Sequence, residues 1–241
     1  MRASDQQVVR GLQMFADMQD AHFRSLMNAA LLQTFPPHVL LIREGELPDF
    51  LHVLVDGTVE MFGSHTNRET TIQVIEPPAT FIVVPVIREE VPLMSARTLV
   101  KSRVLMIPAD AVRDVFGRDS AFARAVVKEL ALRFRDLVRA LKNQKLRTGV
   151  ERLANWILQT DARNGSTGHL IMPFEKRLLA SLLGMTPENL SRNFAALASH
   201  GVMSNGQTIL IKDRKKLQHL AQQNPLIEDL PPTLINKRRR R

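Results

Sequence analysis

The sequence predicts an α+β protein in which an antiparallel β domain is followed by a long helix and a smaller helical domain with one hairpin. Three observations lead to this fold class. Short runs rich in β-branched residues recur at intervals of roughly ten residues in the first half, a helical period begins at Ser120, and two short helices precede an Asn-Gly hairpin signal at Asn205. We expect the β domain in residues 1–112, the long helix in residues 113–146 and the second domain in residues 147–222.

The β domain is expected to begin with a helical stretch over residues 8–32, in which apolar side chains recur at helical spacing. Turn-forming residues such as Gly45, Gly57 and Pro77-Pro78 then separate runs typical of strands. Six strands are predicted in residues 39–43, 50–55, 58–62, 70–75, 96–99 and 104–107. Strands of this spacing favour a barrel or a sandwich.

Composition excludes several classes of function. The chain has 241 residues and no cysteine, which removes disulfides, thiolate zinc sites and Cys-ligated iron–sulfur clusters. No apolar run approaches the roughly 20 residues of a membrane span, and the first ten residues are too polar for a secretory signal. We therefore expect a cytoplasmic protein without a membrane segment.

The formal net charge of +9 is distributed unevenly. Residues 1–112 carry 9 basic and 13 acidic side chains, net −4, whereas residues 113–241 carry the other 24 and 11, net +13. A basic second half suits a protein that meets a polyanion there. The alternative is a solvated basic surface without a partner.

The long helix carries one apolar stripe with heptad spacing, in steps of four and three residues. The stripe consists of Ala123, Val127, Leu130, Phe134, Leu137 and Leu141. Such a stripe lets two helices pack knobs into holes, so we expect homodimerisation through this helix. The alternative is a long helix that lies on its own β domain.

A helix-turn-helix is predicted in residues 174–200. Gly184 allows the left-handed conformation that ends the first helix, Thr186 is a good N-cap, and Pro187 occupies the favoured first helical position. The second helix, residues 186–200, would bury one face against the first. The side chains expected to make this contact are Leu190, Phe194 and Leu197 on the second helix and Leu178, Leu179 and Leu182 on the first.

The opposite face of the second helix presents short and hydrogen-bonding side chains that suit the major groove of DNA. Glu188 is a candidate acceptor from cytosine N4, and Arg192 a candidate donor to guanine. A hairpin around Asn205-Gly206 follows as a wing. The residues predicted to contact DNA are Lys176, Thr186, Glu188, Asn189, Ser191 and Arg192. The alternative is a helical corner with a hairpin that binds nothing. An enzyme is not expected, because the sequence has no Gly-rich phosphate loop, no Gly-x-Ser-x-Gly elbow, no His-Glu-x-x-His and no carboxylate cluster at helical spacing.

These features resemble the Crp/Fnr superfamily of bacterial transcription regulators over nearly the full length of the chain. Arg43-Glu-Gly-Glu46 and Val55-Asp-Gly57 match the glycine pattern of that family's cyclic-nucleotide-binding-type β-roll, and the winged helix-turn-helix matches its DNA-binding domain. The resemblance implies a homodimer that reads a palindromic site and contacts RNA polymerase, acting as an activator. Glu188-x-x-Ser191-Arg192 resembles the Fnr-like branch, which reads TTGAT-type half-sites, whereas Pro187 stands where cAMP-receptor proteins have a further arginine.

The effector region departs from the cAMP-binding pattern of the family. Residues 79–84 replace a Gly-Glu-Leu turn, and Met94-Ser95 replaces an Arg-Ser pair that neutralises the phosphate. A buried phosphate without its arginine is poorly compensated, so cAMP is not expected. The candidates for an effector pocket are Phe81, Ile82, Met94 and Ser95. The alternative function is a cyclic-nucleotide-responsive module that acts on a promoter or a protein partner.

Residues 79–87, 93–99 and 179–192 are similar to the nitric-oxide-responsive regulators of denitrification, the nitrite and nitric oxide reductase regulator group. This similarity implies control of denitrification genes by nitric oxide. A haem is the usual means of capturing nitric oxide without cysteine, with histidine as axial ligand. The sensor half offers His22, His38, His52 and His65, and no spacing singles one out.

Residues 223–241 are expected to form a disordered basic tail, because they contain Pro231-Pro232 and end in five basic residues, 237–241. Attraction to DNA phosphates is a candidate role for this tail.

Overall fold

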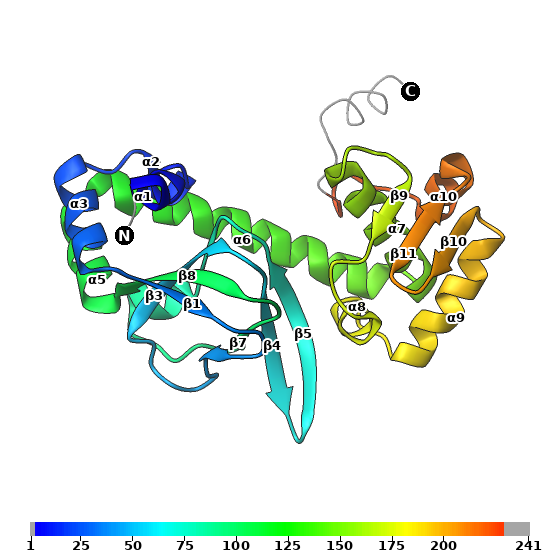
Figure 1. Cartoon of the computed structure of the whole chain (residues 1–241), viewed down its shortest axis with the longest axis horizontal. Helices are drawn as coiled ribbons and strands as arrows, with labels where there is room; N and C mark the ends of the chain where they lie inside the picture. Colours follow the sequence, from blue (N-terminus) through cyan, green and yellow to red (C-terminus); the bar gives the residue numbers. More distant parts are fainter. Residues whose placement is uncertain (1–2, 229–241) are drawn as a thin grey trace. The chain divides into compact units, whose positions relative to one another are not determined.

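The computed structural model describes residues 3–228 and divides the chain into two compact units, residues 1–133 and 134–241. Figure 1 colours the chain from blue at its N-terminus, so that the first unit runs from blue to green and the second from green to orange. The helix α6, Ser120–Leu146, begins in the first unit and continues into the second. The α+β fold class is confirmed.

Three helices open the first unit in place of the single helical stretch predicted over residues 8–32. They are α1 (Ala3–Arg10), α2 (Gln13–Ala16) and α3 (Asp20–Ala29). The stretch is interrupted after Arg10 and again after Ala16, and its last two residues belong to a strand. The prediction was therefore wrong in the continuity and in the end of this helix.

The β domain consists of two four-stranded antiparallel sheets, with strand orders β1-β8-β3-β6 and β2-β7-β4-β5. All six predicted strands are present, as β2 (Leu40–Ile42), β3 (Phe50–Asp56), β4 (Val59–His65), β5 (Arg68–Ile75), β7 (Ser95–Thr98) and β8 (Ser102–Pro108). The structure adds β1 (Leu31–Phe35) and β6 (Ala79–Phe81), and two helices, α4 (Val83–Arg88) and α5 (Ala109–Arg118).

Two apolar cores hold the first unit together. The space between the sheets is packed with Ile42, Leu54, Val59, Met61, Ile75, Phe81, Ile82, Ala96 and Val104. On the other face of β3, Leu51 and Val53 pack with the helices, where the rings of Phe15 and Phe122 stack with their centroids 5.8 Å apart. Each such side chain contributes about 1.5–3 kcal/mol on burial, so the first turns of α6 are fixed to the helical layer of this unit.

Asp119 begins α6 by capping its first turn. One carboxylate oxygen accepts hydrogen bonds from the N–H groups of Ala121 and Phe122, both at 3.0 Å. The other accepts from the N–H of Gln19 at 2.9 Å and lies 3.0 Å from Nδ1 of His22. Burial opposes ionisation of this carboxyl, but the backbone donors, Phe122 and Gln19 foremost, lower the pKa of Asp119 to about 2.

The second unit is built from helices around a three-stranded sheet of order β10-β11-β9. Its elements are α7 (Gly149–Arg163), β9 (His169–Ile171), α8 (Lys176–Leu182), α9 (Pro187–Ala198), β10 (Val202–Asn205), β11 (Thr208–Ile211) and α10 (Arg214–Ala221). One apolar core joins them, with Leu153, Ile157, Leu179, Leu190, Leu197, Ile209 and Leu217 fully buried. The sequence pattern did not predict β9, whose three residues are too few to show a period.

The segment predicted as a tail starts with a folded turn. Residues 224–228 fold back on the second unit, and the side chain of Glu228 is buried there. Residues 229–241, which include the five terminal basic residues, lie outside the described part of the chain. Within the described residues, no helix combines the length and the hydropathy that crossing a membrane would require.

Candidate nucleic-acid interface

The turn between α8 and α9 favours glycine at position 184 because of its backbone conformation. Gly184 has φ +61°, and the N–H of Met185 bonds to the carbonyl of Ala180 at 2.9 Å, as in a Schellman helix end. The side-chain amide of Gln144, near the end of α6, lies directly beside this glycine and would have to move if a Cβ were present. The predicted role of Gly184 in ending the first helix is confirmed.

The start of α9 follows the predicted cap. The side chain of Thr186 accepts a hydrogen bond from the N–H of Asn189 at 3.2 Å, and Pro187 occupies the first turn. The helix buries Leu190, Phe194 and Leu197, as expected from their spacing.

The first helix contributes different side chains from those predicted. Leu179 is buried against α9, but the second buried leucine of this region is Leu183, and Leu178 and Leu182 are only half-buried. The predicted contact set did not include Leu183, which is the C-cap residue of α8 and is buried in the core of the second unit.

The outer face of α9 is exposed along its length. Glu188, Asn189, Ser191, Arg192, Ala195 and Ser199 are all exposed. The Arg192 guanidinium donates to the side-chain oxygen of Asn189, and the hydroxyl of Ser191 donates to the carbonyl of Pro187 at 3.1 Å. A hydrogen bond with the Thr186 side chain holds the pKa of Glu188 below its usual value, aided by its own backbone N–H and by the charge of Arg192. The first two turns therefore present one carboxylate and one guanidinium in defined positions.

Lys176 extends this surface onto α8. Its ammonium lies 5.6 Å from the centroid of the Phe194 ring, which places it beside α9 while the side chain stays exposed. The structure thus brings together all six residues predicted to contact DNA, on one pair of neighbouring helices.

The predicted wing is present as β10 and β11. Asn205 pairs with Thr208, so Gly206 and Gln207 form the two-residue turn, and Gly206 has φ +58°. The residues of the turn are exposed. The wing therefore follows α9 directly, in the order that a winged helix-turn-helix requires.

The apolar stripe of α6 remains largely uncovered in the single chain. Val127, Phe134, Leu137 and Leu141 are 61%, 67%, 58% and 54% exposed, whereas the helix buries Phe122, Ala125 and Val126 instead. Leu130 is half-buried against the helical core and Ala123 is half-buried. The alternative expectation, a long helix that lies on its own β domain, is therefore met by the first turns of α6 only. Most of the stripe is left as an apolar face without a partner in the described chain.

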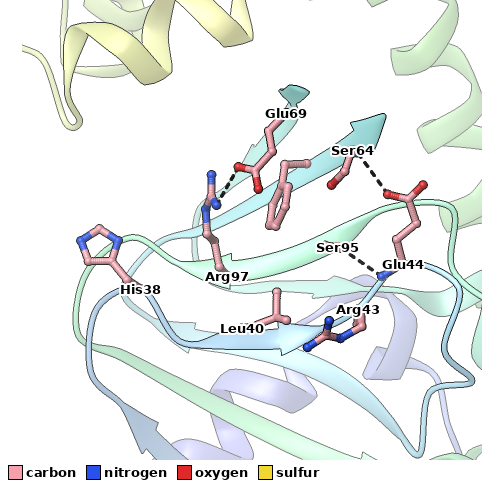
Figure 2. A pocket seen from close by; sticks show the side chains of 9 residues that line it. His38, Leu40, Arg43, Glu44, Ser64, Glu69, Ser95 and Arg97 are labelled. Atoms are coloured by element: carbon pink, nitrogen blue, oxygen red, sulfur yellow. Dashed lines mark hydrogen bonds and ion pairs between the residues drawn. The ribbon is translucent and has the colours of Figure 1, made fainter. Parts of the chain in front are cut away.

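The β domain carries a polar hollow on its β2-β7-β4-β5 sheet (Figure 2). Its volume is about 630 Å³, and it is lined by His38, Leu40, Arg43, Glu44, Phe62, Ser64, Glu69, Ser95 and Arg97. Arg97 is paired inside this hollow: it donates to Glu69 at 2.9 Å and to the buried Glu60 at 2.7 Å, and its guanidinium lies 4.1 Å from the Phe62 ring centroid.

Three of the four predicted effector-pocket residues contribute to packing. Phe81 and Ile82 are buried in the core between the sheets, and Met94 packs against the same core. Ser95 alone among them lines the hollow, where its Oγ accepts from the N–H of Glu44 at 3.0 Å. The interior between the sheets is therefore filled by apolar side chains.

The four histidines of the sensor half lie in different environments. His22 contacts Asp119, His38 is exposed at the hollow, and His65 is exposed at the end of β4. His52 is buried against Phe81, with ring centroids 5.3 Å apart, and its Nδ1 has no hydrogen-bond partner in the described residues. Desolvation lowers the pKa of His52 to about 4.

A haem would need a largely apolar cavity with an axial ligand in its wall. The hollow beside His38 is lined mainly by charged and polar groups, and a second cavity of about 170 Å³ near Met14 and Thr80 has no histidine in its wall. Neither cavity fits a haem. Within residues 3–228, no three His, Asp or Glu side chains are grouped as a metal site would require.

Comparisons with known proteins give two family matches. A family model of the cyclic nucleotide-binding domain matches residues 32–119, and a model of the Crp-like helix-turn-helix domain matches residues 151–220. A comparison with curated proteins finds no match.

Solved structures share the architecture at low sequence identity. FixK2 from Bradyrhizobium japonicum is 21% identical, with a TM-score of 0.70 over 79% of this chain and 96% of its own. A protein from Eubacterium rectale, described as a putative transcriptional regulator of the Crp/Fnr family, is 17% identical. Its TM-score is 0.72, and the match covers 88% of this chain and 99% of that protein. DNR from Pseudomonas aeruginosa is 20% identical, with a TM-score of 0.51 over 91% and 99%.

Each matched domain lies within one of the two units: the first contains the two four-stranded sheets, and the second contains the winged helix-turn-helix. The exposed face of α9 lies inside the matched helix-turn-helix, and the solved structures have the same fold. The chain is therefore a DNA-binding transcription regulator of the Crp/Fnr family.

Proposed function

We propose that this regulator is a homodimer that reads a palindromic, Fnr-like DNA site and activates denitrification genes in response to nitric oxide. The observation that carries the DNA part is the exposed pair Glu188 and Arg192 on the first two turns of α9. A carboxylate that accepts from cytosine and a guanidinium that donates to guanine are a suitable pair for reading a G·C base pair. Ser191 completes the Glu-x-x-Ser-Arg pattern that resembles the Fnr-like branch.

Homodimerisation is supported by the exposed apolar stripe of α6. Four apolar side chains, each more than half exposed and repeated at heptad spacing, form a face that a second copy of the same helix would cover. Two recognition helices related by a two-fold axis would then meet two half-sites about one DNA turn apart, ~34 Å, which is why the site should be palindromic. Contact with RNA polymerase follows from the family resemblance.

The nitric oxide signal rests on the resemblance of residues 79–87, 93–99 and 179–192 to the nitrite and nitric oxide reductase regulators. Control of denitrification genes follows from the same resemblance. Neither described cavity fits a haem, so a haem is not proposed as the group that binds nitric oxide.

One experiment tests the half-site, its symmetry and the signal together. Sequences bound by the purified chain are selected from random DNA, with and without a nitric oxide donor. An inverted repeat of TTGAT-type half-sites, enriched differently in the two conditions, is the expected result. Enrichment of a single unrepeated site would refute the dimeric reader, and identical enrichment with and without the donor would refute the nitric oxide response.

A cyclic-nucleotide-responsive module is the second candidate, favoured by the family match over residues 32–119. Against it stand two observations: the space between the two sheets is filled by apolar side chains, and the guanidinium of Arg97 in the hollow is already bonded to Glu60 and Glu69. Calorimetric titration with cAMP and cGMP separates the two candidates. We expect no heat of binding, and saturable binding of either nucleotide would favour the second candidate.

A further inference from the structure

The C-terminal turn of the described chain is built around Glu228. The N–H groups of Ile227 and Glu228 donate to the carbonyl of Asn224 at 2.8 and 2.9 Å, and the N–H of Asn224 donates to the Glu228 carboxylate at 2.5 Å. These bonds close residues 224–228 into a compact turn. The turn holds the carboxylate of Glu228, which is 1% exposed, toward the interior of the second unit.

The partner of this carboxylate is Arg147, in the short link between α6 and α7. Its side chain is 6% exposed, and its guanidinium forms an ion pair with Glu228. The same guanidinium donates to the carbonyl of Gln222 at 3.3 Å, and Lys142 of α6 donates to the carbonyl of Leu226 at 3.2 Å. Residues 222–228 are therefore fixed to the last turns of α6 and to the short link that follows it.

The backbone of Arg147 continues the network toward the DNA-reading helices. Its carbonyl accepts from the guanidinium of Arg152 at 2.7 Å, and Arg152 also donates to the carbonyl of Leu183 at 2.8 Å. Leu183 ends α8, three residues before the N-cap of α9. A continuous chain of contacts thus joins Glu228 to the turn that sets the recognition helix.

We propose that residues 224–228 act as a latch and that Glu228 is a positioning residue for DNA reading. By holding Arg147, the latch fixes the short link between α6 and α7, and through Arg152 it fixes the turn before α9. A buried guanidinium without its carboxylate is strongly destabilised. In the closed state of the latch Arg147 and Glu228 are therefore paired and buried, and in the open state both are hydrated. This inference rests on DNA reading by α9 and adds a function for the segment after the winged domain.

The decisive variants separate the latch from the basic residues that follow it. A chain ending at residue 230 keeps the latch and loses the five terminal basic residues, whereas a chain ending at residue 223 loses both. Glu228→Gln removes the charge alone, and Arg147→Glu combined with Glu228→Arg exchanges the two charges. Asp136→Asn, at an exposed carboxylate of α6, is the matched control.

Two readouts are measured on each full-length or shortened chain: affinity for the DNA site selected by the wild type, and hydrogen exchange of residues 146–152 and 183–186. Glu228→Gln and the chain ending at residue 223 should each raise Kd about five- to tenfold and speed exchange in both segments. The charge exchange should restore much of the protection, and Asp136→Asn should change neither readout.

The latch is refuted if the chain ending at residue 230 loses as much affinity and protection as the chain ending at residue 223. It is also refuted if Glu228→Gln leaves exchange at residues 183–186 unchanged. If the wild type binds no DNA at all, the proposed DNA reading by α9 is refuted. Hydrogen exchange of the two segments still tests whether Glu228 fixes the link between α6 and α7 and the turn before α9.

Discussion

Nδ1 of His22 lies 3.0 Å from the carboxylate of Asp119, so α3 and the first turn of the long helix α6 share one buried hydrogen-bonding group. The same carboxylate accepts from the backbone N–H of Gln19. The start of the helix that carries the apolar stripe is therefore fixed by a charge as well as by the packing of Phe122.

Replacing this carboxylate should destabilise the first unit. Asp119→Ala removes a helix cap and leaves the N–H of Gln19 without its acceptor, so we expect a loss of about 1–3 kcal/mol in the free energy of unfolding. Urea unfolding monitored by circular dichroism measures this loss, with Asp110→Ala at an exposed site of α5 as the control.

The low pKa of Asp119 also predicts that the free energy of unfolding decreases at acidic pH. The pKa of Asp119 is about 2 in the folded chain, whereas the ordinary value, 3.8, applies to the unfolded chain. The carboxylate therefore stabilises the fold above pH 3.8, and this contribution is lost as the pH falls toward 2. The Asp119→Ala variant should lose less stability over this range than the wild type. Parallel stability curves for the two proteins would contradict this expectation.

His52 predicts a second pH dependence at milder acidity. Its folded pKa of about 4 lies below the ordinary 6.5, so the unfolded chain takes up a proton first and stability falls from pH 6.5 toward pH 4. The loss should approach about 3 kcal/mol at pH 4. His52→Leu should remove this part of the pH dependence, while His65→Leu at the exposed end of β4 should retain it. Equal slopes for wild type and His52→Leu would show that another group is responsible.

Residues with a local signal were predicted well. Gly184, Thr186 and Pro187 specify the turn and the cap by conformation and hydrogen bonding over a few residues, so the recognition helix follows from the sequence alone. The strands β6 and β9 were missed because three residues are too few to show a period, and the first two residues of β1 were assigned to the helical stretch before it.

The candidate sites show the same division. The exposed face of α9 follows from helical spacing, whereas Phe81 and Ile82, chosen as pocket residues, are part of the core. Phe81 ends β6, and Ile82 follows it in a left-handed conformation that leaves its side chain in the same core. The pair Arg147 and Glu228 could not be predicted, since 80 residues separate two side chains that no pattern connects. Burial of an ionisable side chain is a tertiary property, so the environments of His52 and Glu228 could be recognised only from the fold.

Dimerisation can be tested at the uncovered end of the apolar stripe. Leu137→Lys combined with Leu141→Lys places two charges at side chains that are 58% and 54% exposed in the single chain, so the monomer fold should be unaffected. We expect a monomer by light scattering and weak binding to the palindromic site. Leu132→Lys, at an exposed leucine outside the stripe, is the control and should remain dimeric. A double variant with dimer mass would exclude α6 as the interface.

Arg192 provides the test of base reading. Its guanidinium is exposed on α9 and is oriented by the side-chain oxygen of Asn189, as a donor to a base edge should be. Arg192→Ala should cost about 1–3 kcal/mol in binding of the specific site and relax selectivity at one base pair. Asn189→Ala should cost less, because it removes the orienting contact and leaves the donor.

Competition with sites altered at single positions measures both effects, and Lys215→Ala, at an exposed lysine of α10, provides the comparison. A uniform loss over all sites would instead assign Arg192 to a phosphate, because a phosphate contact carries no sequence information.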